Sequence, residues 1–254
     1  MAEQSLKIII EDGEMQEEAL AFSRKENIPI IAAEAQKEED LVLIFAKAGI
    51  RLSGAGQHMK GDLSKMLPRL KPNNLMGEML VKATKRKGVL CPLRVLDATA
   101  GLGEDSLLLA AAGHEVRMVE RDPVIALLLQ DALRRARQEE ALQEIAGRMQ
   151  VCEGDSIQIL HAIANHQEEW KPDMIYLDPM FPGRNKSGLV KKKFQMIHQL
   201  EDPCAEEEKL LTAAIEARPE RIIIKRPAKG PFLAGRKPSY SISGKTVRYD
   251  CLVL

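Results

Sequence analysis

The chain has 254 residues, of which 45% are hydrophobic and 29% are charged, and its 37 basic residues balance 37 acidic ones. This length and composition fit one sizeable α/β domain with a small extra lobe, and the zero net charge argues against a generic nucleic-acid binder. We find no apolar run long enough for a transmembrane helix, no secretory signal, and four widely spaced cysteines without a C-x-x-C pair. We therefore expect a cytoplasmic protein with no bound metal and no membrane partner.

The charges are distributed unevenly along the chain. Residues 1–50 hold eleven acids and five bases, whereas residues 60–94 hold nine bases and two acids. Residues 184–193 hold five bases and residues 221–248 hold eight, and neither segment contains an acid. These basic segments are either ordinary solvated faces or parts of one surface that meets an anionic partner.

The N-terminal residues predict a small α+β lobe over 1–58, and residues 59–93 predict a basic linker followed by a helix. In the lobe, a strand over 6–12 and a helix over 14–27 precede short strands over 29–34, 41–47 and 49–54. Residues 56–74 are polar, basic and turn-rich, which is typical of a linker or a substrate loop. The helical pattern over 75–88 ends at Gly88.

Residues 94–254 alternate between strand and helix patterns, which predicts a mostly parallel, Rossmann-like sheet with right-handed crossovers. The two closing strands form a hairpin around Gly244, so we expect one antiparallel strand near the sheet edge. The expected strands cover 94–98, 115–120, 148–153, 173–178, 221–226, 240–244 and 246–254, and the expected helices cover 104–113, 123–142, 156–167 and 206–217.

A glycine loop follows the first of these strands, in the stretch DATAGLGED that begins at Asp97. Gly101 and Gly103 lack the third glycine of a dinucleotide-binding fingerprint, and no Walker A lysine follows. Glu104 and Asp105 open the next helix, where they would repel a pyrophosphate but accept a cationic, phosphate-free ligand such as S-adenosylmethionine. The alternative is that the two acids only satisfy the helix dipole.

Polar residues at the ends of the next two strands fit the rest of such a ligand. Glu120 stands nineteen residues after Gly101, where a carboxylate can accept hydrogen bonds from both ribose hydroxyls, and Arg121 follows it. Asp155 and Ser156 end the third strand beside the expected adenine position. Ser156 is alternatively only the N-cap of the helix that follows.

The fourth strand ends in Asp178, followed by Pro179, Met180 and Phe181. This run resembles the [DNS]-P-P-[FY] motif of methyltransferases that act on exocyclic amines of bases, with methionine in place of the second proline. Hydrogen-bond acceptors at the amine protons localise the nitrogen lone pair and favour the charge that develops during methyl transfer. Asp178 is therefore the first candidate catalytic residue, and Phe181 is the candidate base-stacking residue. The alternative is a strand that simply ends in a turn.

Residues 74–254 together resemble the RsmJ-type small-subunit rRNA methyltransferases, through the segments LDATAGLGEDSLLLA, VRMVERDPVIALLL, IYLDPMFP, KSGLVKKK and IIIKRP. The resemblance implies a class I methyltransferase sheet and transfer of a methyl group from S-adenosylmethionine to N2 of a guanosine, guanosine 1516, in 16S rRNA. The implied partner is that RNA or the small ribosomal subunit. The resemblance implies cofactor contacts at Glu104, Asp105, Glu120, Arg121, Asp155, Ser156 and Asp178. Asp97, Gly101 and Gly103 of the glycine loop complete the candidate cofactor-binding residues.

Basic residues near the expected catalytic edge are candidates for RNA phosphate contacts. They are Arg184, Lys186, Lys191, Lys192, Lys193, Lys225 and Arg226. Two alternatives stay open at this point: a methyltransferase for an amine in tRNA, DNA or protein, and a non-catalytic RNA-binding module on the same fold.

Overall fold

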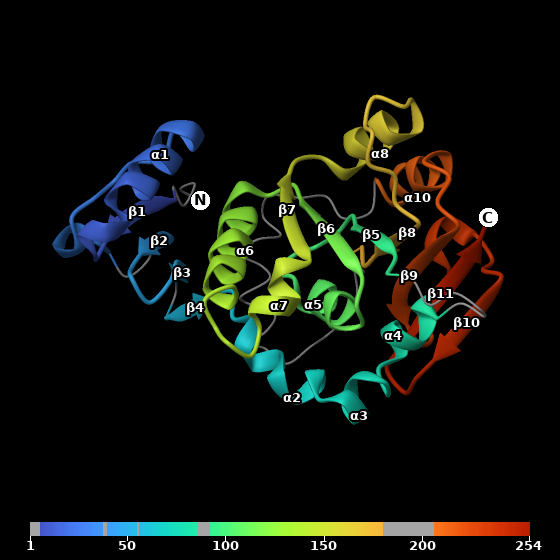
Figure 1. The fold of residues 1–254 in the computed structure, drawn as a ribbon. Helices are drawn as coiled ribbons and strands as arrows, with labels where there is room; N and C mark the ends of the chain where they lie inside the picture. The colour runs from blue at the N-terminus through green and yellow to red at the C-terminus, as the bar shows by residue number, and fades with distance from the viewer. Residues whose placement is uncertain (1–5, 38–39, 55, 86–91, 180–205) are drawn as a thin grey trace.

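A computed structural model describes residues 6–37, 40–54, 56–85, 92–179 and 206–254. A seven-stranded sheet dominates it, in the order β10-β11-β9-β8-β5-β6-β7 (Figure 1). All neighbouring strands are parallel except β11, which runs antiparallel to both β9 and β10, so the expected Rossmann-like sheet with one antiparallel strand near its edge is confirmed. The strands are β5 (Arg94–Asp97), β6 (Glu115–Glu120), β7 (Met149–Glu153), β8 (Met174–Leu177), β9 (Arg221–Pro227), β10 (Tyr240–Ser243) and β11 (Val247–Val253).

Helices cover both faces of this sheet. Side chains alternate between the two faces along each strand, so each face presents apolar residues that a layer of helices buries. In β8, Met174 and Tyr176 join the cluster beneath one set of helices, whereas Ile175 and Leu177 join the cluster on the other face. The first face is covered by α5 (Glu104–Ala111), part of α6 (Pro123–Ala136) and α7 (Gln143–Gly147), and the second by α8 (Ser156–Ala164) and α10 (Glu207–Glu216). Among the described helices, none is long and apolar enough to cross a membrane.

The N-terminal lobe is a four-stranded sheet in the order β1-β2-β3-β4 with one long helix. It comprises β1 (Lys7–Ile10), α1 (Gln16–Glu26), β2 (Val42–Phe45), β3 (Arg51–Gly54) and β4 (Gln57–Met59). The strand expected over 29–34 is wrong: only Ile30 bridges to Ile8, and a 3-10 turn (Ala33–Ala35) follows. Ile30 and Ile31 pack against the apolar clusters of the lobe, but the residues that follow, 32–35, are exposed, and the chain leaves the sheet there.

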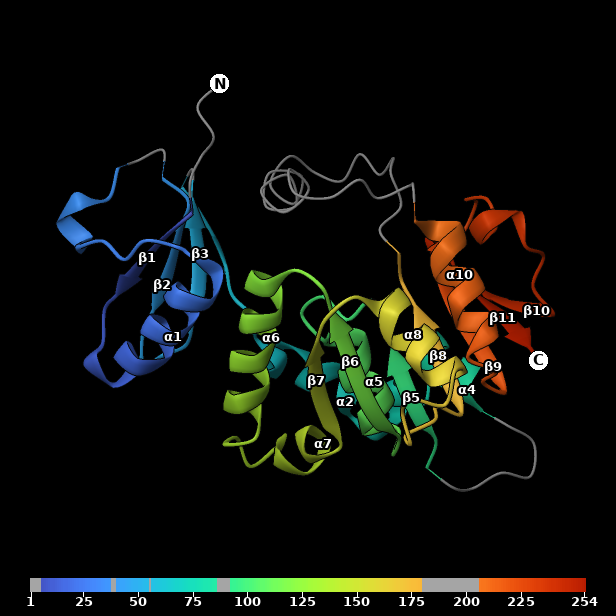
Figure 2. The same cartoon turned by 90° about the horizontal axis from the view of Figure 1, so that it is seen from above.

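The lobe packs against α6, which lies between the two sheets (Figure 2). Leu127 and Leu128 belong to the hydrophobic core of the lobe, whereas Leu129 and Leu133 of the same helix belong to the core of the large sheet. A single helix thus supplies apolar residues to both parts.

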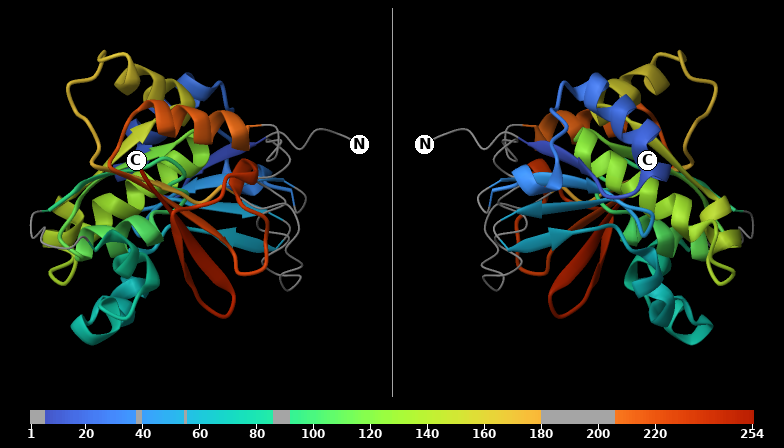
Figure 3. Two further views of the ribbon diagram at one scale, coloured as in Figure 1. Left: turned by 90° about the vertical axis from the view of Figure 1, so that its right-hand side faces the viewer. Right: turned by 90° about the vertical axis from the view of Figure 1, so that its left-hand side faces the viewer.

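The segment expected as a linker is folded instead. Residues 63–84 form a 3-10 turn (Leu63–Met66) and the helices α2 (Leu67–Leu70), α3 (Pro72–Leu75) and α4 (Met79–Thr84), which run along one side of the large sheet toward the β10–β11 hairpin (Figures 1 and 3). The linker prediction is wrong because Leu63, Met66 and Leu70 recur at helical spacing and enter the main core, with the basic residues between them. Helix α4 is also shorter than the helix expected over 75–88, and the expected last residue of that helix, Gly88, lies outside the described residues.

Candidate active site

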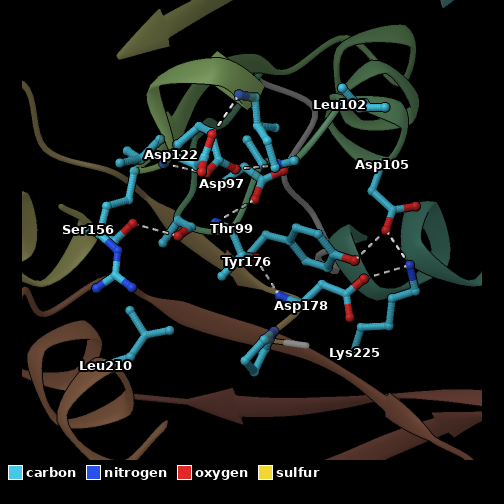
Figure 4. Close-up of a pocket in the computed structure, with 18 of the residues that line it drawn as sticks. Asp97, Thr99, Leu102, Asp105, Asp122, Ser156, Tyr176, Asp178, Leu210 and Lys225 are labelled. Carbon is cyan, nitrogen blue, oxygen red and sulfur yellow. Dashed lines mark hydrogen bonds and ion pairs between the residues drawn. The ribbon is translucent and has the colours of Figure 1, made fainter. Parts of the chain in front are cut away.

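A cavity of about 800 Å³ opens at the carboxyl ends of the parallel strands (Figure 4). Its walls come from the ends of β5, β6, β8 and β9, from the glycine loop, and from the start of α8. Met59, which ends β4 of the N-terminal lobe, and Lys60 after it also line the cavity. This is the edge at which open α/β sheets bind ligands.

Asp97 ends β5 and is almost fully buried in the cavity wall, with 1% of its surface exposed. Its carboxylate accepts hydrogen bonds from the Ser106 hydroxyl at 2.5 Å and from the Thr99 backbone N–H at 3.1 Å. Burial raises the pKa of Asp97 to about 7, and these hydrogen bonds oppose that shift. Asp97 is thus a carboxyl group that a cationic ligand can ionise at neutral pH.

The glycine loop after β5 has a left-handed backbone at Gly101 (φ 53°) and at Gly103 (φ 79°). A Cβ atom on Gly103 would lie 2.7 Å from Leu129 Cδ1, so both the left-handed backbone and this close contact favour glycine at the start of α5. The Gly101 N–H donates to Glu120 Oε2 at 3.0 Å. That bond joins the loop to the end of β6 and fixes the cavity floor.

Glu120 accepts a second backbone N–H, from Asp122 at 2.9 Å through Oε1. Asp122 in turn caps α6 by accepting the N–H groups of Val124 and Ile125, both at 2.9 Å. Asp122 is therefore the N-cap of α6. Glu120 is held as an oriented carboxylate that lines the cavity.

Asp155, Ser156 and Arg121 lie together on a further wall. Asp155 Oδ1 accepts the N–H groups of Ile157 and Gln158 and so caps α8. Ser156 instead donates its hydroxyl to the Ala98 carbonyl at 2.6 Å, so the alternative that Ser156 is the N-cap is wrong. Arg121 Nη1 lies 3.7 Å from Asp155 Oδ2, which places the two predicted residues in contact.

A connected polar cluster surrounds Asp178, the first residue after β8 (Figure 4). Its backbone N–H donates to the Thr99 hydroxyl at 2.6 Å. Its Oδ2 lies 2.9 Å from Lys225 Nζ, and the same ammonium donates to Asp105 Oδ2 at 2.6 Å. The Tyr176 hydroxyl also donates to Asp105 Oδ2 at 2.6 Å. Asp105 therefore joins this cluster rather than capping α5, and Glu104 beside it lines the cavity.

The structure corrects two predicted RNA contacts. Arg226 is only 2% exposed and donates to the Pro231 carbonyl at 3.2 Å and to Glu207 at 3.1 Å, so its prediction as a phosphate contact is wrong. Alternation along β9 turns Arg226 into the core and Lys225 into the cavity, where Lys225 pairs with carboxylates rather than facing open solvent. Phe181, Arg184, Lys186, Lys191, Lys192 and Lys193 lie outside the described residues.

Sequence reasoning missed several residues of the cavity. Tyr176 lies on β8 two positions before Asp178, and Lys225 lies near the end of the neighbouring parallel strand β9, so shared strand ends were the available signal. Thr99 and Lys60 carried no comparable signal, because their places depend on a loop and on how the lobe packs.

The cavity is acidic. Among the described residues, nine carboxylate residues line it against three basic ones, and none of the described residues form a group of three His, Cys, Asp or Glu side chains arranged for a metal ion. Such walls fit the ammonium and sulfonium of S-adenosylmethionine and repel a dinucleotide phosphate. The acids are Asp97, Glu104, Asp105, Glu120, Asp122, Asp155, Asp178, Glu206 and Glu207, and the bases are Lys60, Arg121 and Lys225.

The sheet order, the glycine loop and this acidic cavity define a class I S-adenosylmethionine-dependent methyltransferase. A family model described as "Putative SAM-dependent methyltransferase" matches residues 30–254. A crystal structure of a SAM-dependent methyltransferase from Neisseria gonorrhoeae is similar with a TM-score of 0.73 at 28% identity, over 97% of this chain and 95% of that one. The chain is thus an enzyme whose cofactor is S-adenosylmethionine.

Two relatives with assigned names identify the methyltransferase family more closely. The chain is 40% identical over 238 residues to a ribosomal RNA small subunit methyltransferase J from Dechloromonas aromatica, which covers 91% of this chain and 93% of that protein. A protein of the same name from Thioalkalivibrio sulfidiphilus is 36% identical, over 100% of this chain and 99% of its own length. The chain belongs to the ribosomal RNA small subunit methyltransferase J family.

Proposed function

We propose that this enzyme methylates the exocyclic N2 amine of a guanosine in 16S rRNA of the small ribosomal subunit, guanosine 1516 by the family resemblance. The observation that carries the proposal is Asp178, a carboxylate at the end of β8 that lines the cofactor cavity and precedes the Pro179-Met180-Phe181 run. The names of the relatives from Dechloromonas and Thioalkalivibrio support the ribosomal RNA target. A ribosomal substrate places the enzyme in the cytoplasm.

The chemistry of the target explains the carboxylate. An exocyclic amine on an aromatic base is a poor nucleophile, because its lone pair is delocalised into the ring. S-adenosylmethionine supplies an electrophilic methyl group on a sulfonium. Asp178 accepts a hydrogen bond from the amine, localises the lone pair on nitrogen, and stabilises the positive charge that develops there. The same carboxylate can accept the proton that the methylated nitrogen releases.

The remaining cavity residues divide between cofactor and amine. We assign Asp97 to the ammonium group of the cofactor and Glu120 to its ribose, with Asp155, Ser156 and Arg121 beside its adenine. Gly101 and Gly103 let the backbone approach the methionine part. Of the two neighbouring acids, Glu104 lines the cavity on the cofactor side, whereas Asp105 is bonded to Tyr176 and Lys225 and belongs to the amine side.

RNA contacts fit the loop that follows β9. Two buried arginines hold its backbone: Arg226 donates to the Pro231 carbonyl, and Arg248 Nη1 donates to the Gly230 carbonyl at 2.8 Å. No acid occurs between residues 221 and 248. We assign phosphate contacts to the exposed bases of this loop instead of Arg226. These exposed bases are Lys229, Arg236 and Lys237, and the side chain of Phe232 in the same loop is also exposed.

Methylation assays with 30S particles, free 16S rRNA, tRNA and DNA test the target, followed by mass mapping of the labelled nucleoside. We expect N2-methylguanosine in 16S rRNA. Labelling confined to tRNA, DNA or protein would contradict the proposed substrate while keeping the enzyme class. Binding of 16S rRNA with no binding of S-adenosylmethionine in calorimetry would favour a non-catalytic RNA-binding role.

A further inference from the structure

We propose that Lys225 is a positioning residue, which holds the Asp178 carboxylate ionised and oriented for the target amine. The inference rests on the proposed function of Asp178. It replaces the RNA phosphate contact that the sequence predicted for Lys225 with a role inside the cavity.

The geometry places one ammonium between two carboxylates from different elements. Lys225 Nζ lies 2.9 Å from Asp178 Oδ2 and 2.6 Å from Asp105 Oδ2 (Figure 4). Asp105 is fixed in turn by the Tyr176 hydroxyl at 2.6 Å. The backbone of Asp178 is fixed separately, by its N–H bond to Thr99. Lys225 therefore orients the side chain of Asp178 from β9, through a contact separate from the bond that holds the Asp178 backbone.

The charges explain why a cation is needed here. Asp105 and Asp178 both bond to the same nitrogen, so without that cation their negative charges would repel at short range and one would take up a proton. Lys225 sits in this position as an ammonium: burial opposes its charge, but Asp178 and Asp105 raise its pKa above the ordinary value for lysine. A group in that state donates hydrogen bonds and does not serve as the catalytic base.

Other titratable groups face the same cluster. Tyr249 is the β11 partner of Lys225 in the strand register, and burial followed by the Asp105 charge raises its pKa. Burial likewise raises the pKa of Tyr176 well above its usual range, so both phenols are neutral. Asp97 contributes a further negative charge when ionised. Arg69 contributes a positive one, although it is paired with Glu78 through two hydrogen bonds.

The pH dependence of kcat, measured at saturating RNA and cofactor, tests this role. We expect Lys225→Met to lower kcat at pH 7 by about tenfold or more and to move the acid limb of the profile to higher pH by about one unit, because Asp178 then ionises less readily. Lys225→Arg keeps the charge and should keep the wild-type acid limb. The Kd for S-adenosylmethionine should change by less than about threefold in both variants, since Lys225 does not act on the cofactor.

Asp105→Asn supplies a matched variant that leaves Lys225 in place. Removing the second carboxylate lowers the repulsion on Asp178, so the acid limb should move to lower pH, and in the double variant with Lys225→Met it should return toward the wild type. An unchanged acid limb in Lys225→Met and in Asp105→Asn would overturn the inference. So would a Lys225→Met variant that alters only the KM for RNA and its salt dependence, which is the behaviour of a phosphate contact.

The outcome separates this inference from the proposed function. If Asp178→Ala retains turnover, the assignment of Asp178 fails and the role of Lys225 fails with it. If Asp178→Ala is inactive and Lys225→Met behaves like the wild type, only the role of Lys225 is contradicted.

Discussion

Ser106 donates its hydroxyl to Asp97 Oδ2 at 2.5 Å, although nine residues separate them along the chain. This bond ties the first turn of α5 to the end of β5 across the glycine loop. Ser106 is fully buried, so the bond orients a carboxyl group whose ionisation burial has made costly. The cofactor cavity thus contains an acid poised to respond to a bound cation.

The raised pKa of Asp97 predicts a pH-dependent cofactor affinity. A cationic ligand favours the ionised carboxylate, so the affinity for S-adenosylmethionine should rise as the pH increases through about 7, where the free protein holds a proton on Asp97. Calorimetry in two buffers with different ionisation enthalpies should detect proton release on binding below that pH. Asp97→Asn should bind more weakly and release no proton from this site, and an unchanged proton release in that variant would contradict the assignment.

The raised pKa of Asp97 also makes the stability of the protein without ligand depend on pH. Because the folded-state pKa of Asp97 lies above that of the unfolded chain, its contribution to stability is full below about pH 4 and is lost as the pH rises through about 7. Between those two pH values, the free energy of unfolding of Asp97→Asn should therefore increase relative to that of the wild type. Equal pH profiles from urea unfolding would argue that Asp97 is not buried as described.

Gly103 and Gly101 offer a comparison within one loop. Gly103→Ala should lower the free energy of unfolding by about 2–4 kcal/mol. The alanine would have to adopt the left-handed backbone of Gly103, and its Cβ would also press against Leu129. Gly101→Ala meets no atom within 4 Å, and should cost only about 1–2 kcal/mol of backbone strain. Urea denaturation measures both. Equal costs would mean that the contact with Leu129 relaxes freely.

Arg226 should behave as a structural residue. Arg226→Met removes the group that donates to both the Pro231 carbonyl and Glu207, so the half-buried Glu207 carboxylate loses this ion pair. We therefore expect a loss of about 3 kcal/mol in the free energy of unfolding. Its matched control, Lys229→Ala, should leave the thermal midpoint unchanged and lower RNA affinity, with a shallower dependence on salt. A weaker salt dependence in folded Arg226→Met would restore the original RNA assignment.

Asp131 joins the N-terminal lobe to α6. It is 1% exposed and accepts hydrogen bonds from the Ile50 N–H at 3.1 Å and from Arg135 Nε at 2.9 Å. Asp131→Ala should cost about 3 kcal/mol in urea unfolding, because it leaves the buried Ile50 N–H and the half-buried Arg135 guanidinium without this carboxylate. The exposed pair of Glu144 with Arg148 is the control, since Glu144→Ala should cost less than about 0.5 kcal/mol. Similar losses in the two variants would contradict the role of Asp131.

The periodic parts of the fold were predictable from the sequence. Alternating apolar residues such as those of β8 and β9 determine which face each side chain occupies, and the Gly101 and Gly103 loop marks the ligand edge. The folded segment around Leu63 and Met66 was missed, because interspersed bases and prolines concealed its short helical repeat. Its position depends on a core built by residues far along the chain.

The site was predictable residue by residue where a motif carried it, as at Glu120 and Asp178. The parts of the site formed by side chains of two neighbouring strands were not predictable. Lys225 and Arg226 are adjacent bases in the sequence, yet the pleat of β9 sends one into the cavity and the other into the core. In the structure, the pairing of Leu177 with Ile224 brings the two strand ends together, and Lys225 Nζ lies 2.9 Å from Asp178 Oδ2.

The central claim is that Asp178 activates the target amine, and single-turnover methylation of 16S rRNA by Asp178→Ala tests it most directly. The variant should bind S-adenosylmethionine with an affinity within about tenfold of the wild type, yet lose methyl transfer by about 10³-fold or more, because an interaction made in the transition state is gone. Transfer at a rate close to that of the wild type, with the cofactor bound, would contradict the account.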